Sequence, residues 1–147
     1  MLALAGGATA LGAALLLCDA VPLMRAHGAT APVWSGLEQA VRCALAGTCH
    51  ERPERALKLG GVALVACARC AGLHASGVVG GALAAWGRLR AGMASVCVAA
   101  VALLADVGLG WWAPSWDHPY LRFATGLAFG TSVMVAAVSG VRQPEAP

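Results

Sequence analysis

Long apolar runs constrain this chain more than any other feature of its sequence. Four stretches, at about 2–24, 62–86, 91–112 and 121–141, are predominantly apolar. At a rise of ~1.5 Å per residue, a helix of about 20 residues crosses the ~30 Å hydrocarbon core of a bilayer. We therefore predict an all-α integral membrane bundle of about four transmembrane helices, forming a single domain over residues 1–147.

The composition agrees with a lipid environment. Of the 147 residues, 59% are hydrophobic and only 12% are charged, and the mean hydropathy is +0.73. So few charged side chains cannot cover a water-soluble globule, whereas lipid accepts apolar side chains on the protein surface. The net charge of +3 is spread along the chain, which argues against a nucleic-acid partner. We expect a multi-pass protein of the bacterial inner (plasma) membrane whose partner is the lipid bilayer.

The first apolar run has two other interpretations. A cleaved secretory signal carries basic residues before its apolar core, but here Arg25 follows the run and none precedes it. A lipoprotein cleavage site would end at Cys18, yet Leu17 stands where a small residue is wanted. We therefore interpret the run as a transmembrane helix, with a signal peptide as the alternative.

Residues from about 25 to 59 form a charged, proline-containing extramembrane loop that leads into a Cys-x-x-Cys turn. Within this loop, apolar side chains recur at helical spacing: Trp34, Leu37, Val41 and Leu45. Glu38, Gln39 and Arg42 fall on the opposite face, and Gly47 suits the end of a helix. This pattern predicts an amphipathic helix on the membrane surface.

Cysteine and histidine give the sharpest chemical signal. Cys49 and His50 are adjacent, and Cys67 and Cys70 form a Cys-x-x-Cys turn, in which two sulfurs can bind one ion. Three thiols and one imidazole match the ligand set of a closed tetrahedral zinc site. Because the side chains of adjacent residues diverge, either Cys49 or His50 can instead support the site from outside the coordination sphere. The alternative is that these cysteines pack between helices as small apolar residues.

A redox function would use the same cysteines. A Cys-x-x-Cys at the start of a helix and beside Arg69 would have a lowered thiol pKa, because the helix N-terminus and the guanidinium both favour the thiolate. Cys43 and Cys49 would then be the exchanging loop pair for Cys67 and Cys70, as in four-helix quinone-coupled thiol oxidases. The metal and redox interpretations differ in whether Cys43 matters.

Ionisable residues inside the apolar runs need a partner or a role, because burying a charge in a bilayer is costly. We expect Asp106 and Arg122 to form an ion pair between the third and fourth spans, or alternatively to support the cysteine site. His74 follows Cys70 by one helical turn. It is either a hydrogen-bonded packing residue or a further ligand.

Four motifs resemble, in order, those of the small membrane-protein family known as domain of unknown function 2085. They are Cys49-His50-Glu51-Arg52-Pro53-Glu54-Arg55, Cys67-Ala68-Arg69-Cys70-Ala71-Gly72, Asp106, and Arg122-Phe123-Ala124-Thr125-Gly126. The chain departs from the family pattern at Glu51 (usually Gln), Ala56 (Ser), Ala71 (Thr) and His74 (an aromatic residue). The resemblance runs from about Thr48 to Gly130. It implies a multi-helix membrane protein with a Cys/His site, and it implies no particular reaction.

We therefore predict a metal site, with zinc as the favoured ion. The predicted ligands are Cys49, His50, Cys67 and Cys70, and the predicted supporting residues are Arg55, Arg69, Asp106 and Arg122. An enzyme would keep one coordination position open and would need a general base, for which Glu51, Glu54 and Asp106 are the available carboxylates. A structural site would use all four ligands. The substrate, the reaction and the choice between metal and redox chemistry stay open at this point.

Overall fold

The computed structural model describes residues 2–28, 32–47, 49, 53–87, 91–113 and 117–141. Its six α-helices are α1 (Leu2–Asp19), α2 (Val21–Ala26), α3 (Pro32–Leu45), α4 (Ala68–Trp86), α5 (Met93–Trp112) and α6 (Pro119–Val141). A 3₁₀ turn, η1 (Pro53–Arg55), and two antiparallel strands, β1 (Ala56–Leu59) and β2 (Val62–Cys67), come between α3 and α4 in the chain. The described part of the chain is thus mostly helical, as predicted, with one small sheet added.

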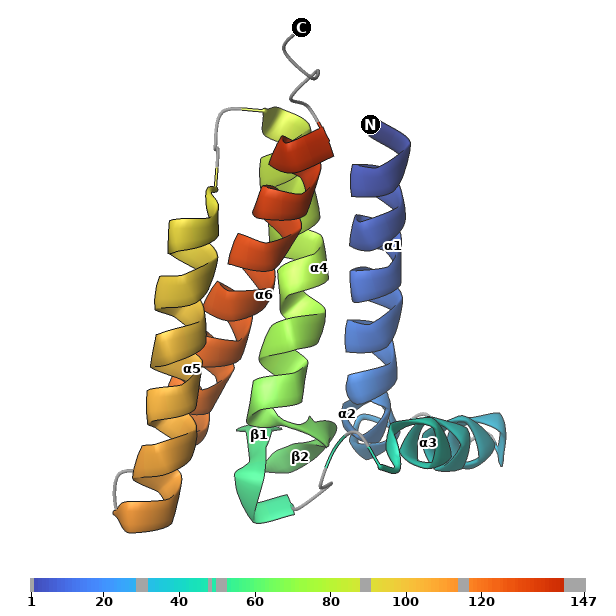
Figure 1. The fold of residues 1–147 in the computed structure, drawn as a ribbon. Helices are drawn as coiled ribbons and strands as arrows, with labels where there is room; N and C mark the ends of the chain where they lie inside the picture. Colours follow the sequence, from blue (N-terminus) through green and yellow to red (C-terminus); the bar gives the residue numbers. More distant parts are fainter. Residues whose placement is uncertain are drawn as a thin grey trace, which may run out of the picture.

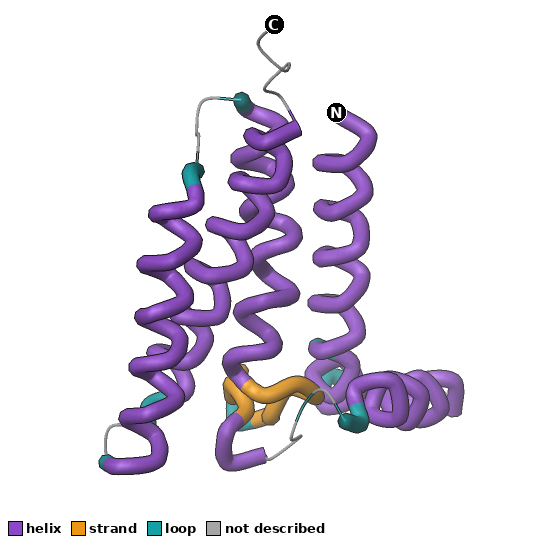
Figure 2. The backbone as a smooth tube through the Cα atoms, viewed as in Figure 1, coloured by secondary structure: helices purple, strands orange, loops and turns teal. Residues whose placement is uncertain are grey.

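Four helices, α1, α4, α5 and α6, run lengthwise in one bundle (Figure 1; Figure 2). α4 packs between α1 and α6, and α5 packs mainly against α6. The beginning of α1 and the end of α6 lie at one end of the bundle, whereas the two strands, α2 and α3 lie at the other (Figure 1). We call this second end, defined by β1 and β2, the hairpin end.

Glycine residues let α4 approach its neighbours closely. A Cβ atom at Gly12 of α1 would lie 2.8 Å from the carbonyl oxygen of His74 and 2.8 Å from the nitrogen of Val78. A Cβ atom at Gly126 of α6 would lie 3.2 Å from the carbonyl carbon of Arg69. Helix backbone cannot move aside as a flexible side chain can, so these positions require glycine. Contacts of this kind are typical of helices that pack in lipid, where close van der Waals contact drives association.

The second predicted span is wrong at its start, because Val62–Cys67 is a strand and α4 begins only at Ala68. Gly60 and Gly61, with φ of +57° and +83°, join Leu59 to its paired residue Val62. A type I′ hairpin turn needs positive φ at both central residues, which glycine adopts without strain. The all-α expectation therefore fails at the two strands. A Gly-Gly pair between two apolar runs is the sequence signal that indicates a hairpin.

The first predicted span is interrupted near its end. α1 stops at Asp19, and α2 starts at Val21 with Pro22 in its first turn. Proline cannot donate a backbone hydrogen bond, and its ring clashes with the carbonyl group four residues earlier. Pro22 therefore accounts for the break at Ala20.

The predicted amphipathic helix is present as α3, which crosses the direction of the bundle helices at the hairpin end (Figure 1). Gly47, with a φ of +91°, follows its last turn. Glu38 accepts hydrogen bonds from Arg25 of α2 (2.7 Å) and from Arg42 (2.9 Å), so α3 is tied to α2. Its place on a membrane surface stays a prediction.

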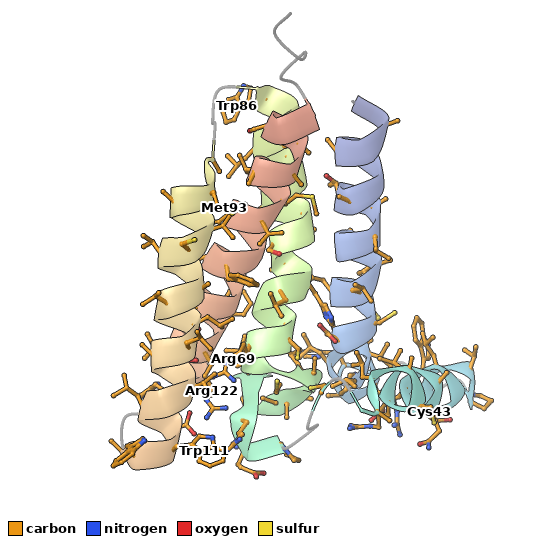
Figure 3. All side chains as sticks on the ribbon, viewed as in Figure 1. Cys43, Arg69, Trp86, Met93, Trp111 and Arg122 are labelled. Carbon is orange, nitrogen blue, oxygen red and sulfur yellow. The ribbon has the colours of Figure 1, made fainter. Side chains whose placement is uncertain are left out.

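Within the described residues, two helices are long and apolar enough to cross a membrane: Met93–Trp112 and Pro119–Gly140. α1 adds a shorter apolar segment, Ala5–Asp19. Aliphatic side chains of α5 point outward, since Val98 is 71% exposed and Leu104 is 68% exposed. Trp86 and Trp111 lie exposed at opposite ends of the bundle (Figure 3), as aromatic residues do at membrane interfaces.

Candidate metal centre

The sulfur atoms of Cys49, Cys67 and Cys70 lie within 4.8 Å of one another. In a tetrahedral site with Zn–S bonds of ~2.3 Å, neighbouring sulfurs are ~3.8 Å apart. Three thiols at this spacing can bind one ion after small side-chain movements. These three residues are among the ligands that the sequence predicts.

Each sulfur is positioned by a different part of the hairpin end. The N–H of Cys49, in the segment after α3, donates to the carbonyl of Leu45 (2.9 Å). Cys67 is the last residue of β2, where it pairs with Ala56 of β1, and its N–H donates to the sulfur of Cys49 (3.2 Å). Cys70 lies in the first turn of α4. The hairpin therefore returns the chain so that the Cys-x-x-Cys turn meets Cys49.

The site is largely shielded from solvent, with Cys49 buried and the other two cysteines half-buried. The pKa of Cys67 is lowered to about 5, chiefly because the thiol of Cys70 donates a hydrogen bond to it, while burial acts in the opposite direction. The backbone N–H of Cys70, the thiol of Cys49 and the N–H of Arg69 lower it further. The thiolate is the form that binds metals and attacks disulfides, so Cys67 suits either chemistry.

The other cysteine and histidine candidates stand apart from this cluster. His50 lies outside the described residues, as does Glu51. Cys43 is exposed on α3 (Figure 3), where the side-chain amide of Gln39 lies 3.9 Å from its sulfur. Arg55 ends η1 and is half-buried.

Arg69 reaches away from the cysteines to Asp106 of α5. Its guanidinium donates to Oδ2 of Asp106 through a terminal nitrogen and through Nε, the latter at 3.2 Å. The hydroxyl of Thr125 on α6 donates to the same oxygen (3.3 Å). The Asp106 side chain is only 5% exposed, so its charge is balanced inside the bundle. This contact ties the Cys-x-x-Cys turn to α5 and α6.

The predicted ion pair between Asp106 and Arg122 is wrong. Arg122 donates through Nε to Asp117, five residues earlier in the chain. Arg122 lies in the first turn of α6, within reach of the segment that leads into the helix, whereas Arg69 of α4 occupies the space beside Asp106. Each of the two arginines thus has a carboxylate partner, but the pairing differs from the predicted one.

Sequence reasoning missed a contact between Asp19 of α1 and His74 of α4. Oδ2 of Asp19 lies 2.7 Å from Nδ1 of His74. His74 is therefore the hydrogen-bonded residue of the first interpretation, and it does not join the three clustered thiols. The sequence did hold a signal for this contact. Both residues are ionisable and interrupt apolar runs, and ionisable residues inside a membrane pair with one another.

Comparison with known proteins places the chain in a family. No curated protein and no solved structure matches it. A family described as "Predicted membrane protein (DUF2085)" matches residues 49–136, which is more than half of the chain. The matched range holds all three clustered cysteines, together with Arg69, Asp106 and Arg122. The chain therefore belongs to the membrane-protein family called domain of unknown function 2085.

Proposed function

We propose that this protein binds one zinc ion at the hairpin end of a membrane-spanning helix bundle. The observation that carries the proposal is the approach of three thiols, from Cys49, Cys67 and Cys70, to within 4.8 Å of one another. Residues that pack only as small apolar groups have no reason to gather their sulfur atoms. Thiolate is a preferred ligand of zinc, and the lowered pKa of Cys67 reduces the cost of losing its proton, whereas the Cys67 thiolate raises the pKa of Cys70, whose proton the ion must displace.

We propose His50 as the fourth ligand, because it follows Cys49 directly in the sequence and because Cys₃His is a common zinc ligand set. Arg69 and Asp106 support the site by anchoring the Cys-x-x-Cys turn to α5. Arg55 directly precedes Ala56, the residue that pairs with Cys67, and we propose that its positive charge favours the thiolates. Arg122 supports the site more distantly, by fixing the start of α6 to Asp117. With all four ligands bound, the site would be structural. If water replaces one ligand, the site has the open coordination position that a catalytic site needs, together with a general base.

The test is elemental analysis of protein purified in mild detergent under reducing, chelator-free conditions. We expect about one zinc ion per chain, from the ligand count of one tetrahedral site. Cys67→Ser and Cys70→Ser should lose the metal and lower the melting temperature together. Cys43→Ser is the matched control and should change neither, since Cys43 is exposed on α3 away from the cluster. Absence of metal from the parent protein would overturn the proposal.

A thiol-disulfide function is the second candidate, favoured by the short separation of Cys67 and Cys70 and by the low pKa of Cys67. In this function, oxidation of Cys67 and Cys70 to a disulfide releases two electrons and two protons, which pass to an oxidised disulfide of Cys43 and Cys49. Alkylation trapping in cells would then find both redox forms of each pair. Thiols that stay reduced, and that react only after a chelator is added, would exclude this exchange and favour the metal.

We also propose that α1, α4, α5 and α6 all span the membrane, in the manner of a multi-pass protein of the bacterial inner membrane. α5 and α6 are the two long apolar helices among the described residues. α1 and α4 have 18 and 19 residues and run beside them in the same bundle (Figure 1). At ~1.5 Å per residue, such helices are ~27–29 Å long, close to the thickness of the hydrocarbon core.

A further inference from the structure

The junction of α1 and α2 leaves backbone carbonyl groups without their helical partners. Pro22 has no N–H, so the carbonyl of Cys18, four residues earlier, lacks the usual donor. The N–H of Leu23 would bond to the carbonyl of Asp19 in a continuous helix, but it donates to Ala20 instead (3.0 Å). Such carbonyl groups at a helix C-terminus carry partial negative charge and attract cations.

Asp19 adds a buried carboxylate at this junction, and its side chain is only half satisfied. The residue is 1% exposed, and its Oδ2 accepts a hydrogen bond from His74. Its other oxygen, Oδ1, is buried and has no hydrogen-bond partner among the residues that the structure describes. A buried carboxyl oxygen without a partner is costly, and a ligand that binds oxygen removes this cost.

We propose that Oδ1 of Asp19 and the carbonyl groups of Cys18 and Asp19, which lack their helical donors, bind an alkali-metal cation, Na⁺ or K⁺. The donors are all oxygen atoms, which suit a hard cation rather than zinc. The one carboxylate among these donors balances the single positive charge of an alkali-metal ion. A divalent cation would leave an uncompensated charge inside the bundle. Membrane transporters bind Na⁺ by a similar combination of a broken helix and exposed carbonyl groups.

This site is separate from the cysteine cluster in its residues and its ligand chemistry. His74 holds one oxygen of Asp19, and the carboxylate is thereby oriented with the second oxygen free for the cation. The same contact joins α1 to α4, so cation binding stabilises the closed bundle. The proposal therefore does not depend on zinc binding, and the two can fail independently.

The test is thermal unfolding of the detergent-purified protein in NaCl, KCl or choline chloride at the same ionic strength. We expect a melting temperature about 3–6 °C higher in NaCl or KCl than in choline chloride when the cation is near ten times its dissociation constant. Asp19→Asn, which keeps the shape of the side chain and removes its charge, should abolish this difference. Zinc content, measured in the same samples, should not change.

Asp117→Asn is the matched control, because Asp117 is a partly buried carboxylate that is already paired with Arg122. It should lower the melting temperature in every salt and keep the difference between salts. If Asp19→Asn does not fold, Pro22→Ala replaces it as the test, since alanine restores an N–H donor for the Cys18 carbonyl and should shrink the difference. Equal melting temperatures of the parent protein in all three salts, or a cation effect that survives in Asp19→Asn, would overturn the proposal.

Discussion

Arg69 stands between the two cysteines of the Cys-x-x-Cys turn, and both its backbone and its side chain are held by other helices. Gly126 of α6 packs against its backbone, and Asp106 of α5 accepts hydrogen bonds from its guanidinium. Motifs that are far apart in the sequence therefore meet at one residue. The positive charge of Arg69 is used to fix the turn in place, rather than to stabilise a thiolate directly.

The pairing of Arg69 with Asp106 is testable by a double-mutant cycle. Arg69→Gln and Asp106→Asn should each destabilise the protein by about 3–5 kcal/mol, because each leaves the opposite charge buried and unpaired. The double variant should cost clearly less than the sum of the two, when unfolding is followed by circular dichroism in detergent. The control cycle joins Asp106→Asn with Arg122→Gln, whose effects should add. Additivity in the first cycle would show that the two side chains do not interact.

For individual residues, the sequence predicted which side chains lie at the candidate site, but it did not predict how the charged side chains pair. The proximity of Cys67 and Cys70 follows from their spacing, and the addition of Cys49 was predicted from residue type. The partner of Asp106 was predicted wrongly, because Arg122 and Arg69 both approach α5 and only helix packing selects between them. The contact of Asp19 with His74 also depends on how α1 packs against α4.

A charged contact between two elements gives a prediction about pH. The side chain of Arg42 donates a hydrogen bond to Glu38 and, with Arg25, holds the pKa of that carboxyl below its usual value. A pKa depressed by folding contributes stability above the unfolded value of 4.5, and this stability is lost as the pH falls through the folded value. Docking of α3 on α2 should therefore weaken as the pH falls below 4.5. The protection factors of α3 amides, which correct for the slower intrinsic exchange in acid, should fall there in the parent, whereas Glu38→Gln should have low protection factors at neutral pH as well.

Helix α4 is the central element of the bundle, and its packing depends on residues without side chains. The backbone of α1 touches it at Gly12, and that of α6 touches it at Gly126. Because both neighbours approach so closely, the positions of His74 and Arg69 relative to Asp19 and Asp106 are fixed by glycine contacts. The polar contacts at the hairpin end therefore depend on the close helix packing at these two glycines.

Gly12→Ala should destabilise the bundle, since its Cβ would lie 2.8 Å from two backbone atoms of α4. The expected cost is about 1–3 kcal/mol, the usual effect of overpacking. Gly108→Ala is the control, because a Cβ there meets nothing within 4 Å, and it should be neutral or slightly stabilising through its helix propensity. Equal effects of the two substitutions on the melting temperature would contradict the close approach of α1 and α4.

The element that the sequence analysis missed is the hairpin of β1 and β2. The residues Val62–Ala66 are apolar, so they extend the run that continues into α4 and read as part of one long helix. Gly60 and Gly61 were available as a turn signal, and β-branched Val62 and Val65 favour a strand. A short apolar strand and a short apolar helix cannot be told apart by periodicity alone. The helices α5 and α6, which are longer and uniformly apolar, were predicted close to their observed ends.

Polar chemistry is concentrated at one end of the molecule. The hairpin end holds the three clustered cysteines, the Arg69–Asp106 pair and the Asp19–His74 contact. At the opposite end, α5 and α6 flank a groove of about 420 Å³ lined by small and apolar residues, among them Val96 and Ala136. This asymmetry, together with the outward-facing aliphatic residues of α5, suits a bundle that lies in lipid and exposes its chemistry to one compartment.

The proposed four-span arrangement makes a prediction about topology. An even number of spans returns the chain to the side where it started, which agrees with the beginning of α1 and the end of α6 lying at the same end of the bundle (Figure 1). A reporter fused after Lys58 should therefore read one compartment, and a reporter fused after Pro147 should read the other. Paired reporters, one active only in the cytoplasm and one only outside it, would identify both positions without knowledge of the orientation. The same compartment for the two fusions would mean that one of α1, α4, α5 and α6 does not cross the membrane. α1 and α4 would be the first to examine, because neither is among the two described helices that are long and apolar enough to cross a membrane.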